Sequence, residues 1–192
     1  MFKLETSSNV YIPAEDSYML AENLLIEEGE SVLEIGTGSG IVAMYASRLT
    51  DKVTATDINA DALLLAENNF KRNGIENIEL LFGDLFEPVK SRKFDVILFN
   101  TPYLPTENDD VVDGDLNYAF DGGSNGRKVI DLFLNELPNH LNDGGKVQLI
   151  QSSLSGNDKT LDLLDDLGFV AEVAISEHFF FEDIVLINGF KI

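Results

Sequence analysis

The chain has 192 residues, 44% of them hydrophobic, and its 34 acidic against 13 basic residues give a formal net charge of −21. This length and hydrophobic content are enough for a buried core, so the charge does not indicate a disordered chain. The absence of cysteine excludes disulfides, thiol nucleophiles and thiolate metal sites, and with only two isolated histidines a catalytic metal centre is not favoured. The excess of acidic residues disfavours direct binding of nucleic acid.

The sequence leads us to expect neither a membrane anchor nor a secretion signal. No stretch contains the roughly 18 uninterrupted apolar residues that a membrane span needs. The first residues, Met1-Phe2-Lys3-Leu4-Glu5, also lack the layout of a signal peptide. We therefore expect a cytoplasmic protein that does not bind membranes. About residues 1–28 are expected to form an N-terminal segment with a helix led by Pro13.

Short apolar runs typical of strands then alternate with segments that have helical spacing. This alternation predicts a mostly parallel, doubly wound sheet with helices on both faces. The predicted strands are 32–35, 53–56, 78–82, 94–99 and 147–150, and the predicted helices are 41–46, about 60–72, about 127–137 and about 157–167.

The end of the chain breaks this alternation. Two predicted strands, 169–175 and 184–187, are too close in sequence for a helical crossover, so they should pair as an antiparallel hairpin at the edge of the sheet. The intervening Phe179-Phe180-Phe181 is expected to pack in the core or at that edge, and the alternative interpretation is a substrate box.

A glycine-rich loop follows the first predicted strand. The strand runs through Glu34 and Ile35 into Gly36-Thr37-Gly38-Ser39-Gly40, which leads into the first helix after it. Glycines permit a tight turn and let a flat ligand approach the backbone. A dinucleotide-binding fingerprint would have its third glycine at Ile41, so the spacing weakens the interpretation as a dehydrogenase.

Acidic residues follow the next two predicted strands. Asp57 lies about 20 residues beyond the glycine loop and could accept hydrogen bonds from the two hydroxyls of a ribose. Asp84 could accept a hydrogen bond from an adenine amino group. Each acid alone could be a helix cap or a turn residue. Their position at successive strand ends favours an adenosine-containing ligand.

The fourth predicted strand ends in Asn100-Thr101-Pro102-Tyr103. One interpretation is an ordinary turn, since Asn and Pro both favour turns. In the other, the Asn100 side-chain carbonyl and a neighbouring backbone carbonyl accept the two hydrogens of a planar NH2 group, and Tyr103 supplies a flat wall. This arrangement would hold an amide or an aromatic amine.

These segments resemble the class I S-adenosylmethionine-dependent methyltransferases, in the branch whose fourth strand ends in Asn-Pro-Pro-Tyr. They are similar to the archaeal and eukaryotic HemK-like enzymes, which methylate the glutamine of the Gly-Gly-Gln motif in class I release factors. Tyr11-Ile12-Pro13-Ala14-Glu15-Asp16-Ser17 resembles their Tyr-x-Pro-x-Glu-Asp-Ser/Thr segment, and Gly122-Gly123-Ser124-Asn125-Gly126-Arg127 resembles their glycine-rich lead-in to a later helix. The resemblance covers about residues 10–135, and Thr101 departs from it by replacing the first proline of the motif.

The resemblance implies a seven-stranded, Rossmann-like methyltransferase fold over a single domain, residues 1–192, with S-adenosylmethionine as the cofactor and no metal. It places Glu34 near the methionine amino group, Asp57 on the ribose, and Glu15 and Asp16 beside the methionine end. Glu15 could instead simply be part of the polar first turn of a helix. The implied cofactor-binding residues are Ser17, Glu34, Gly36, Thr37, Gly38, Gly40, Asp57, Ile58, Asp84, Leu85 and Asn100.

The same resemblance implies which residues meet the substrate. Asn100, Pro102 and Tyr103 are the implied catalytic residues, and about residues 103–125 are interpreted as a substrate loop. The acids of this loop could dock a basic protein, although the overall acidity could also reflect a salty cytosol. The implied substrate-binding residues are Pro13, Glu15, Asn100, Thr101, Pro102 and Tyr103, and the acids of the loop are Glu107, Asp109, Asp110, Asp113, Asp115 and Asp121.

The resemblance also implies a small zinc-binding activator subunit that adds a strand to the sheet edge at residues 78–82. The alternative is a monomer that covers this edge itself. Two other functions stay open at this point: an N6-adenine or guanine methyltransferase acting on DNA or RNA, and a methyltransferase-like binding module without turnover. The resemblance favours a release factor as the substrate, and the charge of the chain opposes the nucleic-acid alternative.

Overall fold

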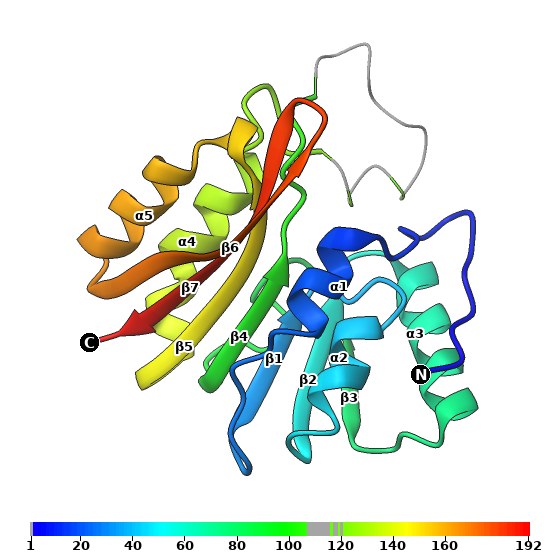
Figure 1. Cartoon of the computed structure of the whole chain (residues 1–192). Helices are drawn as coiled ribbons and strands as arrows, with labels where there is room; N and C mark the ends of the chain where they lie inside the picture. Colours follow the sequence, from blue (N-terminus) through cyan, green and yellow to red (C-terminus); the bar gives the residue numbers. More distant parts are fainter. Residues whose placement is uncertain (1, 107–115, 117–118, 120) are drawn as a thin grey trace.

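The computed structural model describes residues 2–106, 116, 119 and 121–192, and it contains a seven-stranded sheet in the order β3-β2-β1-β4-β5-β7-β6 (Figure 1). Pairs among β1 to β5 are parallel, whereas β7 pairs antiparallel with β5 and β6. The mostly parallel sheet and its C-terminal antiparallel hairpin are thus confirmed. The strands are β1 Ser31–Ile35, β2 Lys52–Asp57, β3 Ile78–Phe82, β4 Phe94–Asn100, β5 Leu141–Ser152, β6 Phe169–Phe179 and β7 Glu182–Lys191.

Helices cover both faces of this sheet (Figure 1). Along β4, Val96 and Leu98 pack with α1, α2 and α3, whereas Ile97 and Phe99 pack with α4 and α5 on the opposite face. Successive strand residues point to opposite faces, so a strand covered on both sides reads as a continuous apolar run. The helices are α1 Glu15–Ala21, α2 Ile41–Ala46, α3 Ala60–Asn73, α4 Lys128–His140 and α5 Asn157–Asp166, with a 3₁₀ turn, η2, at Ser153–Ser155.

Helix α4 continues three residues beyond its predicted end at 137 and passes through Pro138. The reason is the packing of its last turn. The His140 ring is buried and stacks on Phe86 with ring centroids 4.3 Å apart, and His140 Nδ1 lies 3.1 Å from the carbonyl oxygen of Arg92. Tertiary contacts therefore outweigh the tendency of proline to end the helix.

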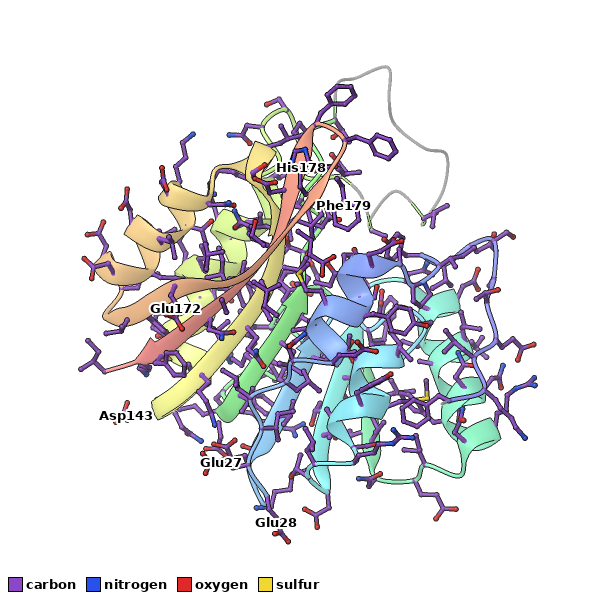
Figure 2. The ribbon with its side chains drawn as sticks, in the orientation of Figure 1. Glu27, Glu28, Asp143, Glu172, His178 and Phe179 are labelled. Carbon is purple, nitrogen blue, oxygen red and sulfur yellow. The ribbon has the colours of Figure 1, made fainter. Side chains whose placement is uncertain are left out.

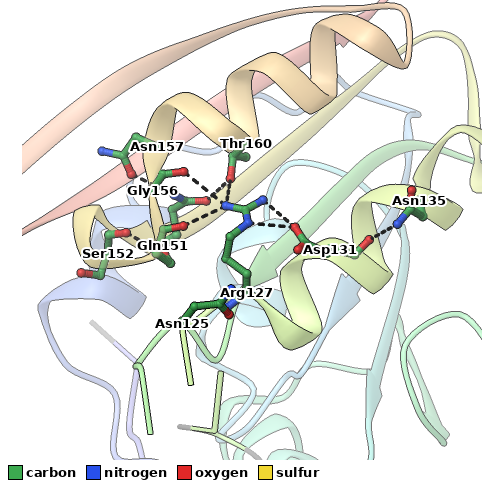
Figure 3. A network of polar contacts seen from close by, with 10 residues as sticks. Asn125, Arg127, Asp131, Asn135, Gln151, Ser152, Gly156, Asn157 and Thr160 are labelled. Carbon is green, nitrogen blue, oxygen red and sulfur yellow. Dashed lines mark hydrogen bonds and ion pairs between the residues drawn. The ribbon is translucent and has the colours of Figure 1, made fainter. Parts of the chain in front are cut away.

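The start of α4 is fixed by a buried arginine (Figure 3). Arg127 Nε and Nη2 donate to Asp131, and Nη1 donates to the carbonyl oxygens of Ser155 and Gly156 and to Thr160 Oγ1. The cation is compensated by one carboxylate and several neutral acceptors, as a buried charge requires. The network holds the glycine-rich lead-in to α4 against the turn that follows β5.

The β6–β7 turn corrects the expectation that all three phenylalanines of Phe179-Phe180-Phe181 are packed. Phe179 is partly buried against the core, but Phe180 is 92% exposed and Phe181 is 95% exposed. The strands are longer than predicted and leave only these two residues to connect β6 with β7. Phe180 has a φ of +47°, and the tight turn directs both side chains away from the sheet.

Strand β3 forms the other edge of the sheet, as predicted. Ile78 and Leu80 pack against the core, whereas Phe82 is 63% exposed. Across the described part of the chain, no helix combines the length and the apolar character needed to cross a bilayer.

Candidate active site

A cavity of about 440 Å³ opens at the carboxyl ends of the parallel strands. It lies where the strand order reverses, because β1 connects through α2 to β2 on one side and β4 connects through α4 to β5 on the other. Open α/β sheets bind their ligands at this topological switch point. Fourteen predicted site residues line it: Pro13, Ser17, Glu34, Gly36, Thr37, Gly38, Asp57, Ile58, Asp84, Leu85, Asn100, Thr101, Pro102 and Tyr103.

Two predicted site residues do not line the cavity. Glu15 is exposed in the first turn of α1, as the alternative interpretation has it, and the structure does not bring it to the other site residues. Gly40 lies at the start of α2 with a φ of +83°, and a Cβ atom there would stand 2.5 Å from Phe70 Cε1 on α3. Gly40 therefore serves the close packing of the loop on α3.

The glycine loop is held by Asp57 at the end of β2. Asp57 Oδ2 accepts a hydrogen bond from the Gly38 amide at 2.8 Å, and Oδ1 accepts one from the Asn59 amide at 2.8 Å. Burial raises the pKa of Asp57, although these backbone hydrogen bonds oppose the shift. A nearly buried carboxylate thus lies at the junction of the loop and the β2 end, where it faces the cavity.

Glu34, at the end of β1, is only 3% exposed. Its Oε2 accepts a hydrogen bond of 2.7 Å from Thr37 Oγ1. Burial raises the pKa of Glu34 to about 8, and the nearby charge of Asp57 adds to the increase. Because the Thr37 hydroxyl and the Ala43 amide that donate to it are both neutral, Glu34 is suited to a positively charged group that enters the cavity.

Asn100, at the end of β4, belongs to a polar network around Asp16. Asn100 Nδ2 donates to Asp16 Oδ2 at 2.9 Å, and Tyr103 OH lies 3.4 Å from the same oxygen. Tyr11 OH and the Ser17 amide donate to Asp16 Oδ1 at 3.0 and 2.6 Å. Asn100 Oδ1 is buried and has no hydrogen-bond partner among the residues that the structure describes. The amide nitrogen is therefore engaged while its oxygen is available to a ligand.

The two tyrosines of this network are not suited to act as bases. Burial is the main cause that raises the pKa of Tyr103 far above its ordinary value, and the charge of Asp16 is the next. The same two causes raise the pKa of Tyr11. Both phenols are therefore protonated at neutral pH, and Tyr103 contributes its ring and its hydroxyl to the cavity wall.

Thr101 is tied to β5 by two bonds to the Ile150 carbonyl oxygen, 2.7 Å from Oγ1 and 3.3 Å from the amide nitrogen. A proline at this position could make neither bond. The hydroxyl and the amide thus restrain the turn where the family motif has a rigid proline.

Beyond the strand ends, the structure describes only part of the predicted substrate loop, about residues 103–125. Leu104, Leu116, Ala119 and Asp121 line the cavity. Thr106 donates to Asp121, and this bond is the main cause that lowers the Asp121 pKa. The other acids of the predicted loop, Glu107, Asp109, Asp110, Asp113 and Asp115, lie outside the described residues.

The sequence interpretation missed the contribution of Glu182. This residue begins β7, yet its side chain lines the cavity, and its Oε2 is buried with no hydrogen-bond partner in the described part of the chain. No sequence signal could have identified it, because Glu182 lies 82 positions after Asn100 in the chain and belongs to no motif. In the described ranges, no group of three or more His, Asp or Glu side chains is arranged to hold a metal ion.

Comparisons with known proteins give a consistent set of relatives. Residues 8–114 match the model of the family described as "Methyltransferase small domain". The chain is 46% identical over 191 residues to the "Putative protein N5-glutamine methyltransferase" of Methanocaldococcus jannaschii, covering 99% of this chain and 96% of the relative. It is also 29% identical to the release factor glutamine methyltransferase of Geobacter sulfurreducens over 84% of this chain, but it spans only 59% of that longer protein.

A solved structure has the same fold. It is the E. cuniculi Mtq2–Trm112 complex, described as responsible for the methylation of the eRF1 translation termination factor. The TM-score is 0.73 at 25% sequence identity, and the match covers 96% of this chain and 99% of the solved chain.

Proposed function

The chain belongs to the methyltransferase small domain family, and from this membership we propose that it methylates the glutamine side-chain amide in the Gly-Gly-Gln motif of a class I peptide-chain release factor. The relatives named as N5-glutamine and release factor glutamine methyltransferases support this substrate. One observation carries the proposal: Asn100 lines a cavity that can admit a planar amide, and its buried Oδ1 has no hydrogen-bond partner in the described part of the chain.

The residues of the cavity fit S-adenosylmethionine. Glu34 is a buried carboxylate with a pKa of about 8 and suits the cofactor's ammonium group. Asp57 offers carboxylate oxygens to the ribose hydroxyls, and Asp84 and Leu85 form a wall for the adenine. When bound, the cofactor supplies an electrophilic methyl group whose leaving group is a neutral thioether.

The protein's contribution is then to align the glutamine amide. An amide nitrogen is a poor nucleophile because its lone pair is delocalised. Asn100 Oδ1 and the adjacent backbone carbonyl of Thr101 accept its two hydrogens, which orients the nitrogen and favours localisation of its lone pair. Asp16 binds Asn100 Nδ2 and so prevents the Asn100 amide from turning its nitrogen toward the substrate. Pro102 and Tyr103 confine the amide to one plane.

The remaining expectations from the sequence are part of this proposal. Residues 1–192 act as a single methyltransferase domain, Pro13 contacts the substrate, and about residues 103–125 contribute to its binding. Glu15, whose side chain lies outside the cavity, contacts a part of the release factor beyond the target glutamine. We place the protein in the cytoplasm as part of this proposal, because its proposed substrate is a translation factor.

We further propose that a small zinc-binding activator pairs with the outer edge of β3. The Trm112-bound relative supports this partner. The exposed Phe82 side chain supplies an apolar contact beside an edge that has no neighbouring strand in the described sheet.

The test is mass spectrometry of a release factor after incubation with the chain, the activator and S-adenosylmethionine. We expect one added methyl group on the motif glutamine. Asn100→Ala should lower turnover by about 10²–10³-fold, because it removes an acceptor that orients the reacting group. Calorimetry should show its cofactor affinity within about threefold of that of the unmodified protein, a change of less than 1 kcal/mol.

Asn135→Ala is the matched control, because Asn135 is an exposed residue of α4 whose side-chain amide donates to the carbonyl oxygen of Asp131, outside the cavity lining. It should methylate at the unmodified rate. Methyl transfer to a nucleic acid and not to the release factor, or full activity of Asn100→Ala, would contradict the proposal.

A further inference from the structure

The β6–β7 turn exposes two large aromatic side chains next to the cavity. Phe180 and Phe181 are the most exposed large hydrophobic residues among those that the structure describes, at 92% and 95%. Single exposed apolar residues are ordinary, but two phenylalanines at one projecting turn are typical of a binding surface. Their neighbour Phe179 packs against the core and anchors the turn (Figure 2).

Polar contacts hold this turn in a defined position. The Asp183 amide donates to Ser153 Oγ of η2 at 2.9 Å, and His178 Nδ1 lies 2.8 Å from Asp183 Oδ1 across the hairpin. Ordered residues on both sides of the turn therefore present Phe180 and Phe181 on a supported base. Such preorganisation reduces the entropic cost of binding a partner.

Glu182 connects the turn with the cavity. It directly follows Phe181, lines the cavity, and has a buried Oε2 without a partner in the described ranges. A buried carboxylate oxygen without a donor is unfavourable until a bound molecule supplies one. The alignment mechanism does not use this oxygen, so it is available to a part of the substrate other than the reacting amide.

The charge of this hairpin indicates what kind of molecule binds. Residues 169–183 contain Glu172, Glu177, Glu182 and Asp183 but no lysine or arginine, in a chain of net charge −21. Phosphate backbones are repelled by such a surface, whereas basic polypeptide is attracted. Aromatic side chains surrounded by acids match a protein surface that is both apolar and basic.

We propose that the β6–β7 turn docks the protein substrate, with Phe180 and Phe181 buried against an apolar surface of the release factor and Glu182 bound to a basic side chain next to the target glutamine. The inference rests on the proposed function, because it takes the owner of the glutamine as the partner. The two phenylalanines add a contact outside the cavity that a free glutamine or a short peptide could not make.

The test compares kcat/KM for an intact release factor with kcat/KM for a short peptide that contains the Gly-Gly-Gln motif. The double variant Phe180→Ser/Phe181→Ser should lower kcat/KM for the intact release factor about tenfold relative to kcat/KM for the peptide, because aromatic anchors dominate protein interfaces. Val170→Ser is the matched control: Val170 is 61% exposed near the start of β6, at the far end of the hairpin from the turn, and its variant should keep the unmodified ratio. An unchanged ratio in the double variant would overturn the inference.

Glu182→Gln should raise KM about tenfold for the intact protein and for a peptide that retains the basic neighbours of the glutamine, with kcat little changed. Calorimetric binding of the intact release factor to Asn100→Ala, with and without the turn substitutions, separates docking from turnover. If the turn substitutions weaken binding, the docking inference is supported. If in addition the unmodified chain transfers no methyl group to the release factor, the proposed function alone fails. Absence of binding, or binding independent of the turn, overturns the inference.

Discussion

At the level of single residues, the environment of the amide at Asn100 decides what that side chain can do. The sequence predicted its position at a strand end, but it could not predict the bond from Asn100 Nδ2 to Asp16, 84 positions earlier. A residue motif indicates which chemical groups are present, whereas their orientation depends on contacts made by the folded chain. The same holds for Glu182, which reaches the cavity from the start of β7, after a turn that has no recognisable motif.

Glu34 gives a prediction about proton release. Its pKa of about 8 lies above the ordinary value, so the carboxyl is mostly protonated at pH 6.5 in the free protein. Pairing with the cofactor's ammonium group favours the ionised form, lowers this pKa and therefore expels the proton. Titration calorimetry at pH 6.5 in buffers of different ionisation enthalpy should show release of about one proton per cofactor bound.

The Glu34→Gln variant should bind the cofactor more weakly and release no proton on binding it. The control Glu136→Gln alters an exposed glutamate of α4 and should behave as the unmodified protein does. Equal proton release by the Glu34→Gln variant and the unmodified chain would show that Glu34 does not meet the ammonium group.

At the level of elements, the predictable parts were those with a clear hydrophobic period. Helix α3 spans Ala60–Asn73, close to its predicted range of about 60–72: Asn59 caps its start by accepting a hydrogen bond from the Asp61 amide, and Gly74 caps its end with a left-handed φ of +66°. Strand β5 begins at Leu141, six residues before its predicted start at 147. The prediction placed the start too late because Asn142-Asp143-Gly144-Gly145 has the composition of a turn. Leu141 pairs with Phe94 and Lys146 with Val96, so residues 142–145 lie at a register shift between paired positions of the same strand. Pairing on both sides of this segment thus continues β5 through a composition that favours a turn.

The junction of the glycine loop with α2 and α3 can be tested by Gly40→Ala. The substitution combines a left-handed φ of +83° with a Cβ that would overlap Phe70, so unfolding free energy should fall by about 2–4 kcal/mol in urea denaturation. Gly29→Ala is the matched control, because Gly29 has a φ of +85° but nothing within 4 Å of the added Cβ. Its cost should be about 1 kcal/mol. Equal losses in the two variants would mean that contact with Phe70 does not require glycine.

At the level of the whole molecule, the acidity is not confined to the candidate site. Glu27, Glu28 and Asp143 lie at the end of the sheet remote from the β6–β7 turn, and Glu172 lies on β6 between the two ends (Figure 2). Only part of the charge can therefore serve a partner that docks at the cavity. The rest acts on the folded chain as mutual repulsion, which opposes the compact state at low ionic strength.

This repulsion predicts opposite effects of salt on stability and on substrate binding. Raising potassium chloride from about 0.05 M to about 0.5 M shortens the screening length several-fold, so repulsion between exposed acids weakens and the Tm should rise by several degrees. The same screening weakens attraction between the acidic hairpin and a basic release factor, so KM for that protein should rise. The variant Glu28→Gln/Glu172→Gln removes two exposed charges and should raise the Tm at low salt but have little effect at high salt. If the Tm were independent of salt, self-repulsion would be too weak to matter, and the acids would have to be explained by binding alone.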